Sequence, residues 1–208
     1  MDDLFLQKGF PRIYESVLRL PVIRSIRRQE QETLQQAFAE KIAPTDHVLE
    51  VGAGTGYYTL DIARRARSVT AVERSPGMIR ILRQRIESAG AGNVTLVESD
   101  FFSGAPARRF DVVIAIGVLD CVTDAKGFLD RCVSLAGKCV IVTIPQSSVW
   151  AAIHAFFGGM MGVRISVYKP EEIASYLNGH PYTLRETGLR TRWTRGLTLV
   201  AVINTRIP

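Results

Sequence analysis

The stretch VLEVGAGTG at residues 48–56 decides the fold. A short aliphatic run ends in three glycines at alternate positions, Gly52, Gly54 and Gly56, and a helical pattern begins directly after them. This order is typical of a buried strand that ends in a tight turn at the start of a helix, because glycine adopts the backbone conformations that tight turns need. Ligands of open α/β sheets bind beyond the carboxyl ends of the strands. The turn therefore predicts a site for a nucleotide-like ligand.

The spacing of the glycines separates two kinds of nucleotide site. A dinucleotide-binding fold needs G-x-G-x-x-G, in which the third glycine packs the helix against the strand beneath a pyrophosphate. Here the pattern is G-x-G-x-G, and the bulky pair Tyr57 and Tyr58 follows it. The turn does not match a dinucleotide site.

Strand patterns and helical patterns alternate along residues 46–144. Aliphatic and β-branched runs predict strands at His47–Val51, Val69–Glu73, Val94–Glu98, Asp111–Ile116 and Cys139–Ile144. Helical spacing is found at Gly56–Ala66, Pro76–Ala89 and Asp124–Ala136. The crossover at Asp100–Arg109 is short and contains Gly104 and Pro106, so no full helix is expected there. This alternation predicts an open, mostly parallel sheet.

The flanking segments are expected to complete one domain over residues 1–208. Residues 1–44 read as an N-terminal helical cap that is broken at Pro21, and residues 145–208 continue beyond the core at 46–144. In that last part a helix begins near Pro170, and two strand patterns, at Tyr182–Glu186 and Gly196–Val202, predict an antiparallel hairpin at the sheet edge. The expected fold class is α/β: a Rossmann-like open sheet of seven strands, with helices on both faces.

Composition places the chain among ordinary globular proteins, with 47% hydrophobic and 22% charged residues. The three cysteines, Cys121, Cys132 and Cys139, form no CxxC pair and have no histidine cluster nearby, so no disulfide framework and no metal site are expected. The N-terminus is acidic, and no apolar run reaches the roughly 18 residues that span a bilayer. We therefore expect a cytoplasmic protein. Its net charge of +6 can attract an anionic partner or form a solvated face.

Residues 46–144 resemble the class I S-adenosylmethionine-dependent methyltransferases, over about half of the chain. The first motif is similar to the family's E/D-x-G-x-G-x-G, with Glu50 and the three glycines in the matching places. The resemblance implies that the turn, Ala53 included, wraps the methionine part of the cofactor and that Glu50 helps to hold its amino group. A structural carboxylate is the alternative for Glu50. The implied cofactor is S-adenosylmethionine, and its product is S-adenosylhomocysteine.

Two further acidic positions match the family at the ends of the next strands. Glu73 closes the second strand, where a carboxylate can accept hydrogen bonds from both ribose hydroxyls. Asp100 follows the third strand and matches the acid that accepts from the adenine 6-amino group, with Glu98 as a rival. The resemblance also implies that the backbone amide of Phe101 donates to the adenine ring, which its side chain could flank.

The remaining predicted site residues lie beside these motifs. The resemblance implies cofactor contacts from Arg74, Met78 and Ile116, although core packing explains Met78 equally well. Asp120 and His154 are candidate catalytic bases; the alternatives are a helix cap or surface acid for Asp120 and a satisfied or solvent-facing histidine for His154. Direct displacement at the cofactor's sulfonium needs no metal.

The prediction for the acceptor depends on the segment SVWAAIHAFFGGMM at residues 148–161. It is apolar, aromatic and interrupted by glycine, and it forms either an acceptor lid or an ordinary buried helix. A lid predicts a small, fairly apolar or lipid-like acceptor, and the basic helix Arg19–Arg28 could then meet anionic lipid. The layout beyond Ile144 is loosely similar to the magnesium-protoporphyrin methyltransferases.

Nucleic acid is disfavoured as the acceptor. Residues 48–100 also resemble the adenine dimethyltransferases of ribosomal RNA, which need an N/D-P-P/L-Y/F turn after the fourth strand. The corresponding residues here are IGVL at 116–119. Because no unambiguous base is visible, a non-catalytic cofactor-binding subunit remains the alternative to an enzyme, and the oligomeric state stays open.

Overall fold

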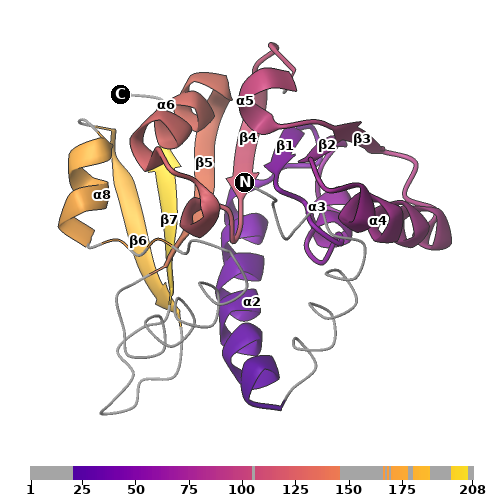
Figure 1. Cartoon of the computed structure of the whole chain (residues 1–208), viewed down its shortest axis with the longest axis horizontal. Helices are drawn as coiled ribbons and strands as arrows, with labels where there is room; N and C mark the ends of the chain where they lie inside the picture. The colour runs from indigo at the N-terminus through magenta and orange to yellow at the C-terminus, as the bar shows by residue number, and fades with distance from the viewer. Residues whose placement is uncertain are drawn as a thin grey trace.

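A single mixed sheet organises the chain in the computed structural model, which describes residues 21–104, 106–145, 166, 168, 170–177, 180–187 and 198–205. The seven strands in these ranges have the order β3-β2-β1-β4-β5-β7-β6 (Figure 1). Strands β1 to β5 are parallel, and β7 is antiparallel to both β5 and β6. The fold class expected from the sequence is confirmed.

All seven predicted strands are present. Their bounds are β1 His47–Val51, β2 Ser68–Glu73, β3 Val94–Glu98, β4 Phe110–Ala115, β5 Ala136–Pro145, β6 Tyr182–Thr187 and β7 Thr198–Asn204. Strand β5 begins three residues before the expected Cys139 because Ala136 pairs with Phe110, ahead of a shift in register between Phe110 and Val112.

The helices agree with the sequence pattern except after the glycine turn. They are α2 Pro21–Lys41, α3 Thr59–Ala63, α4 Pro76–Ala89, α5 Phe101–Gly104, α6 Ala125–Leu135 and α8 Pro170–Tyr176, with a 3-10 turn η2 at Leu119–Cys121. Helix α3 is shorter than the expected Gly56–Ala66, because the turn extends through Gly56, whose φ of 83° lies outside the helical region. The short α5 confirms that the third crossover lacks a full helix.

Side chains at the helix ends explain two of these boundaries. The hydroxyl of Ser75 accepts a hydrogen bond from the Met78 N–H at 3.4 Å and caps α4, which ends at Gly90 with a left-handed φ of 61°. The carboxylate of Asp124 accepts from the Gly127 N–H at 2.9 Å and caps α6. Serine and aspartate are residue types that often cap helices.

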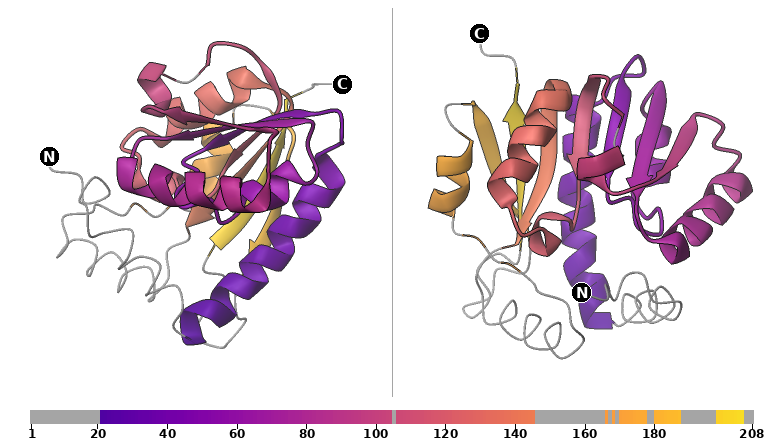
Figure 2. Two further views of the ribbon diagram at one scale, coloured as in Figure 1. Left: turned by 90° about the vertical axis from the view of Figure 1, so that its right-hand side faces the viewer. Right: turned by 45° about the horizontal axis from the view of Figure 1, so that its top comes forward.

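Helices cover both faces of the sheet (Figure 2). On one face α2 and α3 pack Phe38 and Ile62 against strand residues such as Val48, and Leu82 of α4 packs beside them on Ala71. On the other face α6 and α8 contribute a second cluster of buried residues, including Phe128, Leu129, Ile173 and Leu177. None of the helices in the described residues is long and apolar enough to cross a membrane.

Candidate functional site

The glycine turn lies at the point where the strand order reverses. Strand β1 pairs with β2 on one side and β4 on the other, and open α/β sheets bind ligands at such a switch point. Gly52, Gly54 and Gly56 have φ values of 68°, 57° and 83°, which L residues rarely adopt. The sequence identified this turn correctly as the backbone feature that needs glycine.

The surroundings of the three glycines differ. A Cβ on Gly52 would clash with Val118, and one on Gly56 would clash with Leu82. A Cβ on Gly54 would meet nothing nearer than the carbonyl oxygen of Gly52, at 4.0 Å. The turn is therefore packed closely at both ends and open in the middle.

The carboxylate of Glu73 lies against the middle of the turn. It accepts hydrogen bonds from the Gly54 N–H at 2.9 Å, from the Arg74 N–H at 2.9 Å and from the Ser75 N–H at 2.8 Å. Charge-assisted bonds of this kind are stronger than neutral ones, so the carboxylate is held firmly at the open part of the turn. Two sequence signals nineteen residues apart are brought into contact. The side chain of Arg74 is exposed.

Glu50 lies in the interior below the turn, and only 4% of its surface is exposed. Burial raises the pKa of this carboxyl to about 8, the hydroxyl of Thr59 lowers it by donating to Oε2 at 2.6 Å, and the nearby Glu73 raises it. A cationic ligand group would favour the ionised form. Thr59 was missed in the sequence, because no local pattern shows that its hydroxyl contacts Glu50, nine residues earlier.

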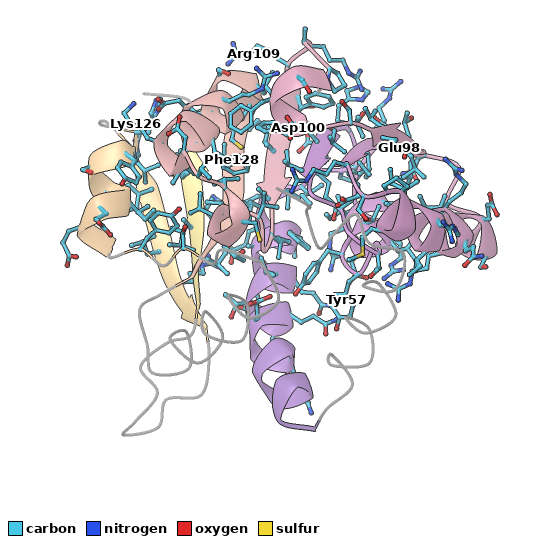
Figure 3. All side chains as sticks on the ribbon, viewed as in Figure 1. Tyr57, Glu98, Asp100, Arg109, Lys126 and Phe128 are labelled. Carbon is cyan, nitrogen blue, oxygen red and sulfur yellow. The ribbon has the colours of Figure 1, made fainter. Side chains whose placement is uncertain are left out.

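The acid after β3 has a structural role in addition to the one predicted for it. Oδ1 of Asp100 accepts from the Phe102 N–H at 2.8 Å and from the Ser103 N–H at 3.3 Å, so that Asp100 caps α5. Asp100 and its rival Glu98 are both exposed on the β3 side of the site (Figure 3). A contact with adenine stays a prediction for either.

Phe101 belongs to the core between α5 and α6. It is 7% exposed, and its ring centroid lies 5.3 Å from that of Phe128. The guanidinium carbon of Arg131 also lies 5.3 Å from the Phe101 ring centroid. These contacts account for the side chain without a ligand.

Three other predicted cofactor contacts are apolar residues. Met78 is 4% exposed in the first turn of α4, and Ala53 is 8% exposed. Ile116 is partly buried at the end of β4. The burial of Met78 agrees with its alternative as a core residue, and contact with adenine remains a prediction.

The segment after β4 is attached to its neighbours at two points. The Gly117 N–H donates to the hydroxyl of Thr143 on β5 at 2.8 Å, and the hydroxyl of Tyr168 donates to the carbonyl of Leu119 at 3.3 Å. Since Val118 lies against Gly52, this segment connects the glycine turn with β5. No motif in the sequence had indicated Thr143 or Tyr168.

The predicted catalytic bases and the predicted lid fall outside what the structure describes. His154, residues 148–161, and Arg19 lie outside the described residues, as do the side chains of Asp120 and Arg24. Of the basic N-terminal helix, Arg28 is described; it is exposed and pairs with Glu32 at 3.0 Å.

Helix α2 contacts the tyrosines that follow the turn. The hydroxyl of Tyr57 donates to Gln31 at 2.9 Å, and that of Tyr58 donates to Glu30 at 3.0 Å. Figure 3 shows Tyr57 beside α2, where 40% of its surface is exposed. Helix α2 thus contacts the residues that directly follow the glycine turn.

Part of the chain is similar to known proteins. Residues 48–137 match the family model described as a methyltransferase domain. A mitochondrial ribosomal RNA small subunit methyltransferase of Arabidopsis thaliana is 40% identical over 75 residues, which is 36% of this chain and 20% of that protein. A probable cobalt-precorrin-6B C(15)-methyltransferase (decarboxylating) of Methanobrevibacter smithii is 28% identical over 122 residues, 56% of this chain and 64% of that protein. The chain thus spans less than two thirds of either relative.

The likeness to solved structures covers more of the chain. The magnesium protoporphyrin IX methyltransferase of Synechocystis PCC 6803, with bound SAH, superposes with a TM-score of 0.75. The match covers 97% of this chain and 96% of that one at 21% sequence identity. At this identity the likeness establishes a shared fold.

Proposed function

We propose that this chain, whose residues 48–137 form a class I S-adenosylmethionine-dependent methyltransferase domain, binds S-adenosylmethionine at the glycine turn and transfers its methyl group to a small acceptor. The contact between Gly54 and Glu73 carries the proposal. It joins the turn that would wrap the methionine part to the carboxylate that would bind the ribose, at an N–O distance of 2.9 Å.

The residues at the turn fit this cofactor. The open space beside Gly54 admits a ligand close to the backbone. The carboxylate of Glu73 offers about four acceptor positions and accepts three backbone hydrogen bonds, so about one position is left for a ligand hydroxyl group. Buried Glu50 offers a carboxyl whose ionised form an ammonium group would stabilise.

The cofactor, when bound, supplies an electrophilic methyl group on a sulfonium. The protein then has to hold donor and acceptor in line, and such orientation can contribute about 7–11 kcal/mol to lowering a barrier. The glycine turn and Glu73 would fix the donor, whereas the segment after β4 would face the acceptor. We propose Asp120 or His154 as the base where the acceptor must lose a proton.

We propose a fairly apolar or lipid-like small molecule as the acceptor. The segment after β4 supports this, since it reads IGVL where an RNA adenine methyltransferase needs polar and aromatic residues, and Leu119 in it is fully buried. The apolar composition of residues 148–161 points the same way. The ribosomal RNA relative covers 36% of this chain, whereas the magnesium protoporphyrin IX methyltransferase matches almost all of its fold.

Three free cysteines bear on where the reaction takes place. Cys121 is exposed, and Cys132 and Cys139 are buried, with no disulfide between them. Proteins of oxidising compartments usually pair such residues. We therefore propose a reducing, cytoplasmic setting.

Two measurements test the proposal in sequence. Isothermal titration calorimetry with S-adenosylhomocysteine should give a binding heat for the wild type that is lost in Gly54→Arg, and absence of heat in the wild type would refute the donor site. Cell extract is then incubated with protein and S-adenosylmethionine labelled on the methyl group. Label in the organic-extractable fraction supports the acceptor class, whereas label in RNA or protein contradicts it. Binding without any transfer would indicate a non-catalytic subunit.

A further inference from the structure

The peptide group between Thr55 and Gly56 is held at both ends. Its carbonyl oxygen, on Thr55, accepts a hydrogen bond from Nη1 of Arg85 at 3.0 Å. Its N–H, on Gly56, donates to the carbonyl oxygen of Ala53 at 3.0 Å. Nη1 of Arg85 also lies 3.3 Å from the Thr55 hydroxyl oxygen. Because the peptide group is planar, contacts at its two ends fix its orientation within the turn.

Helix α4 brings Arg85 to this position. Arg85 lies three residues after Leu82, so both side chains project from the same face of the helix. Leu82 is fully buried and occupies the space that a Cβ on Gly56 would need. The packing of Leu82 on Gly56 therefore sets the distance between α4 and the turn, and the guanidinium of Arg85 bridges it.

The same helix is also joined to the carboxylate of the site. Helix α4 begins after Ser75, whose N–H donates to Glu73, and that carboxylate accepts from Gly54 as well. The start of α4 thus contacts one side of the turn through Glu73, and its third turn contacts the other side through Arg85. Movement of α4 would disturb the two contacts together.

We propose that Arg85 is a positioning residue for the donor site, whose guanidinium holds the Thr55–Gly56 peptide in the orientation that S-adenosylmethionine requires. The inference rests on the proposed function, since it names the residue that orders the same site. Arg85 acts through the backbone of the turn. Its hydrogen bond to the Thr55 carbonyl comes from a charged donor, which makes it stronger than a bond between neutral groups.

The test compares Arg85→Met with Arg83→Met in the full chain. Methionine keeps the apolar stem and removes the donors, and Arg83 is an exposed arginine on the same helix that provides the matched control. Calorimetry with S-adenosylhomocysteine should show about tenfold weaker binding in Arg85→Met, equivalent to about 1.4 kcal/mol, and a change of less than about twofold in Arg83→Met.

Amide hydrogen exchange without cofactor gives the second readout. Exchange at the Gly56 N–H should accelerate in Arg85→Met, whereas exchange at Leu49, in the middle of β1, should be unchanged. A general loss of stability would accelerate both, so this comparison separates positioning from a merely structural role. Because hydrogen exchange is measured without cofactor, it tests whether Arg85 orders the turn even if the wild type binds no S-adenosylhomocysteine. Absence of binding by the wild type would refute the proposed function.

Two results would overturn the inference. One is an Arg85→Met protein that binds S-adenosylhomocysteine within about twofold of the wild type. The other is unchanged exchange at Gly56. Should Arg85→Met fail to fold, Arg85→Leu replaces it, because leucine also removes the donors and keeps an apolar side chain. An Arg85→Leu protein with wild-type affinity and wild-type exchange at Gly56 would overturn the inference in the same way.

Discussion

Replacing Gly54 and Gly90 by alanine separates the function of the turn from the strain of its backbone. The two glycines have φ values of 57° and 61°, and a Cβ would find no atom closer than 4.0 Å at Gly54 and none within 4 Å at Gly90. Each substitution should therefore cost the same, about 1–2 kcal/mol for a left-handed alanine. In a domain of this size that corresponds to a fall in Tm of roughly 2–8 °C, which differential scanning calorimetry measures.

The affinity for S-adenosylhomocysteine should differ between the two variants. The methyl group of Gly54→Ala would occupy the open space in the middle of the turn, next to the N–H that Glu73 holds. Forcing an extra methyl into a packed contact costs about 1–3 kcal/mol, so affinity for S-adenosylhomocysteine should fall about 5- to 150-fold. Gly90→Ala lies at the end of α4 and should leave the affinity almost unchanged.

Two outcomes would refute this reasoning. Equal affinities in Gly54→Ala and Gly90→Ala would show that the ligand does not approach the turn at Gly54. A much larger loss of Tm in Gly54→Ala than in Gly90→Ala would show that the space at Gly54 is needed by the protein itself. The calorimetric Kd must be measured well below the lower Tm, so that both proteins are folded during the titration.

Three further predictions concern stability. Gly56→Ala combines left-handed strain with a clash on Leu82 and should cost about 2–5 kcal/mol in urea unfolding; a cost equal to that of Gly90→Ala would contradict it. Burial raises the pKa of Glu50 from 4.5 to about 8, so its contribution to stability is full below pH 4.5 and is lost as the pH rises through 8. The free energy of unfolding, measured with urea at pH 5, 7 and 9, should therefore fall less between pH 5 and pH 9 in Glu50→Gln than in the wild type, by up to about 4 kcal/mol. An equal fall in both proteins would disprove the raised pKa. Phe128→Ala removes a ring that is 1% exposed and lies 5.3 Å from Phe101. The free energy of unfolding in urea should fall by about 3–5 kcal/mol. A fall of less than about 1 kcal/mol would show that the neighbouring side chains move to fill the space.

The sheet could be predicted because its signals are local in sequence. Each parallel strand is a short apolar run that is followed by a turn or a cap, as Val51 is by Gly52 and Glu73 is by Ser75. The length of α3 could not be predicted, since the residues after Gly56 have helical spacing, and only the backbone of the turn shows where the helix begins. The early start of β5 depends on pairing with Phe110, which is a contact between distant segments.

The sequence indicated where the candidate site residues lie in the fold, but not which side chains contact them. Because strands that run parallel end at one edge of the sheet, reading the residues at the end of each strand pointed to Gly52, Glu73 and Asp100 without any structure. The partners of these residues follow no periodic pattern: Thr59 contacts Glu50, and Arg85 contacts the turn from 30 residues away. Asp100 shows a second difficulty: a residue at a predicted binding position also has a structural role, because it caps α5.

The same physical reason explains why the proposed donor site draws on more sequence signals than the proposed acceptor. The predicted contacts with S-adenosylmethionine lie in the turns that directly follow β1, β2 and β3, so one continuous stretch of sequence contains nearly all of them. The proposed acceptor would instead meet the segment after β4. That segment is positioned by Thr143 and Tyr168, which come from beyond the matched residues 48–137. Relatives that share only the donor half can therefore differ in acceptor, as a ribosomal RNA enzyme and a precorrin enzyme do.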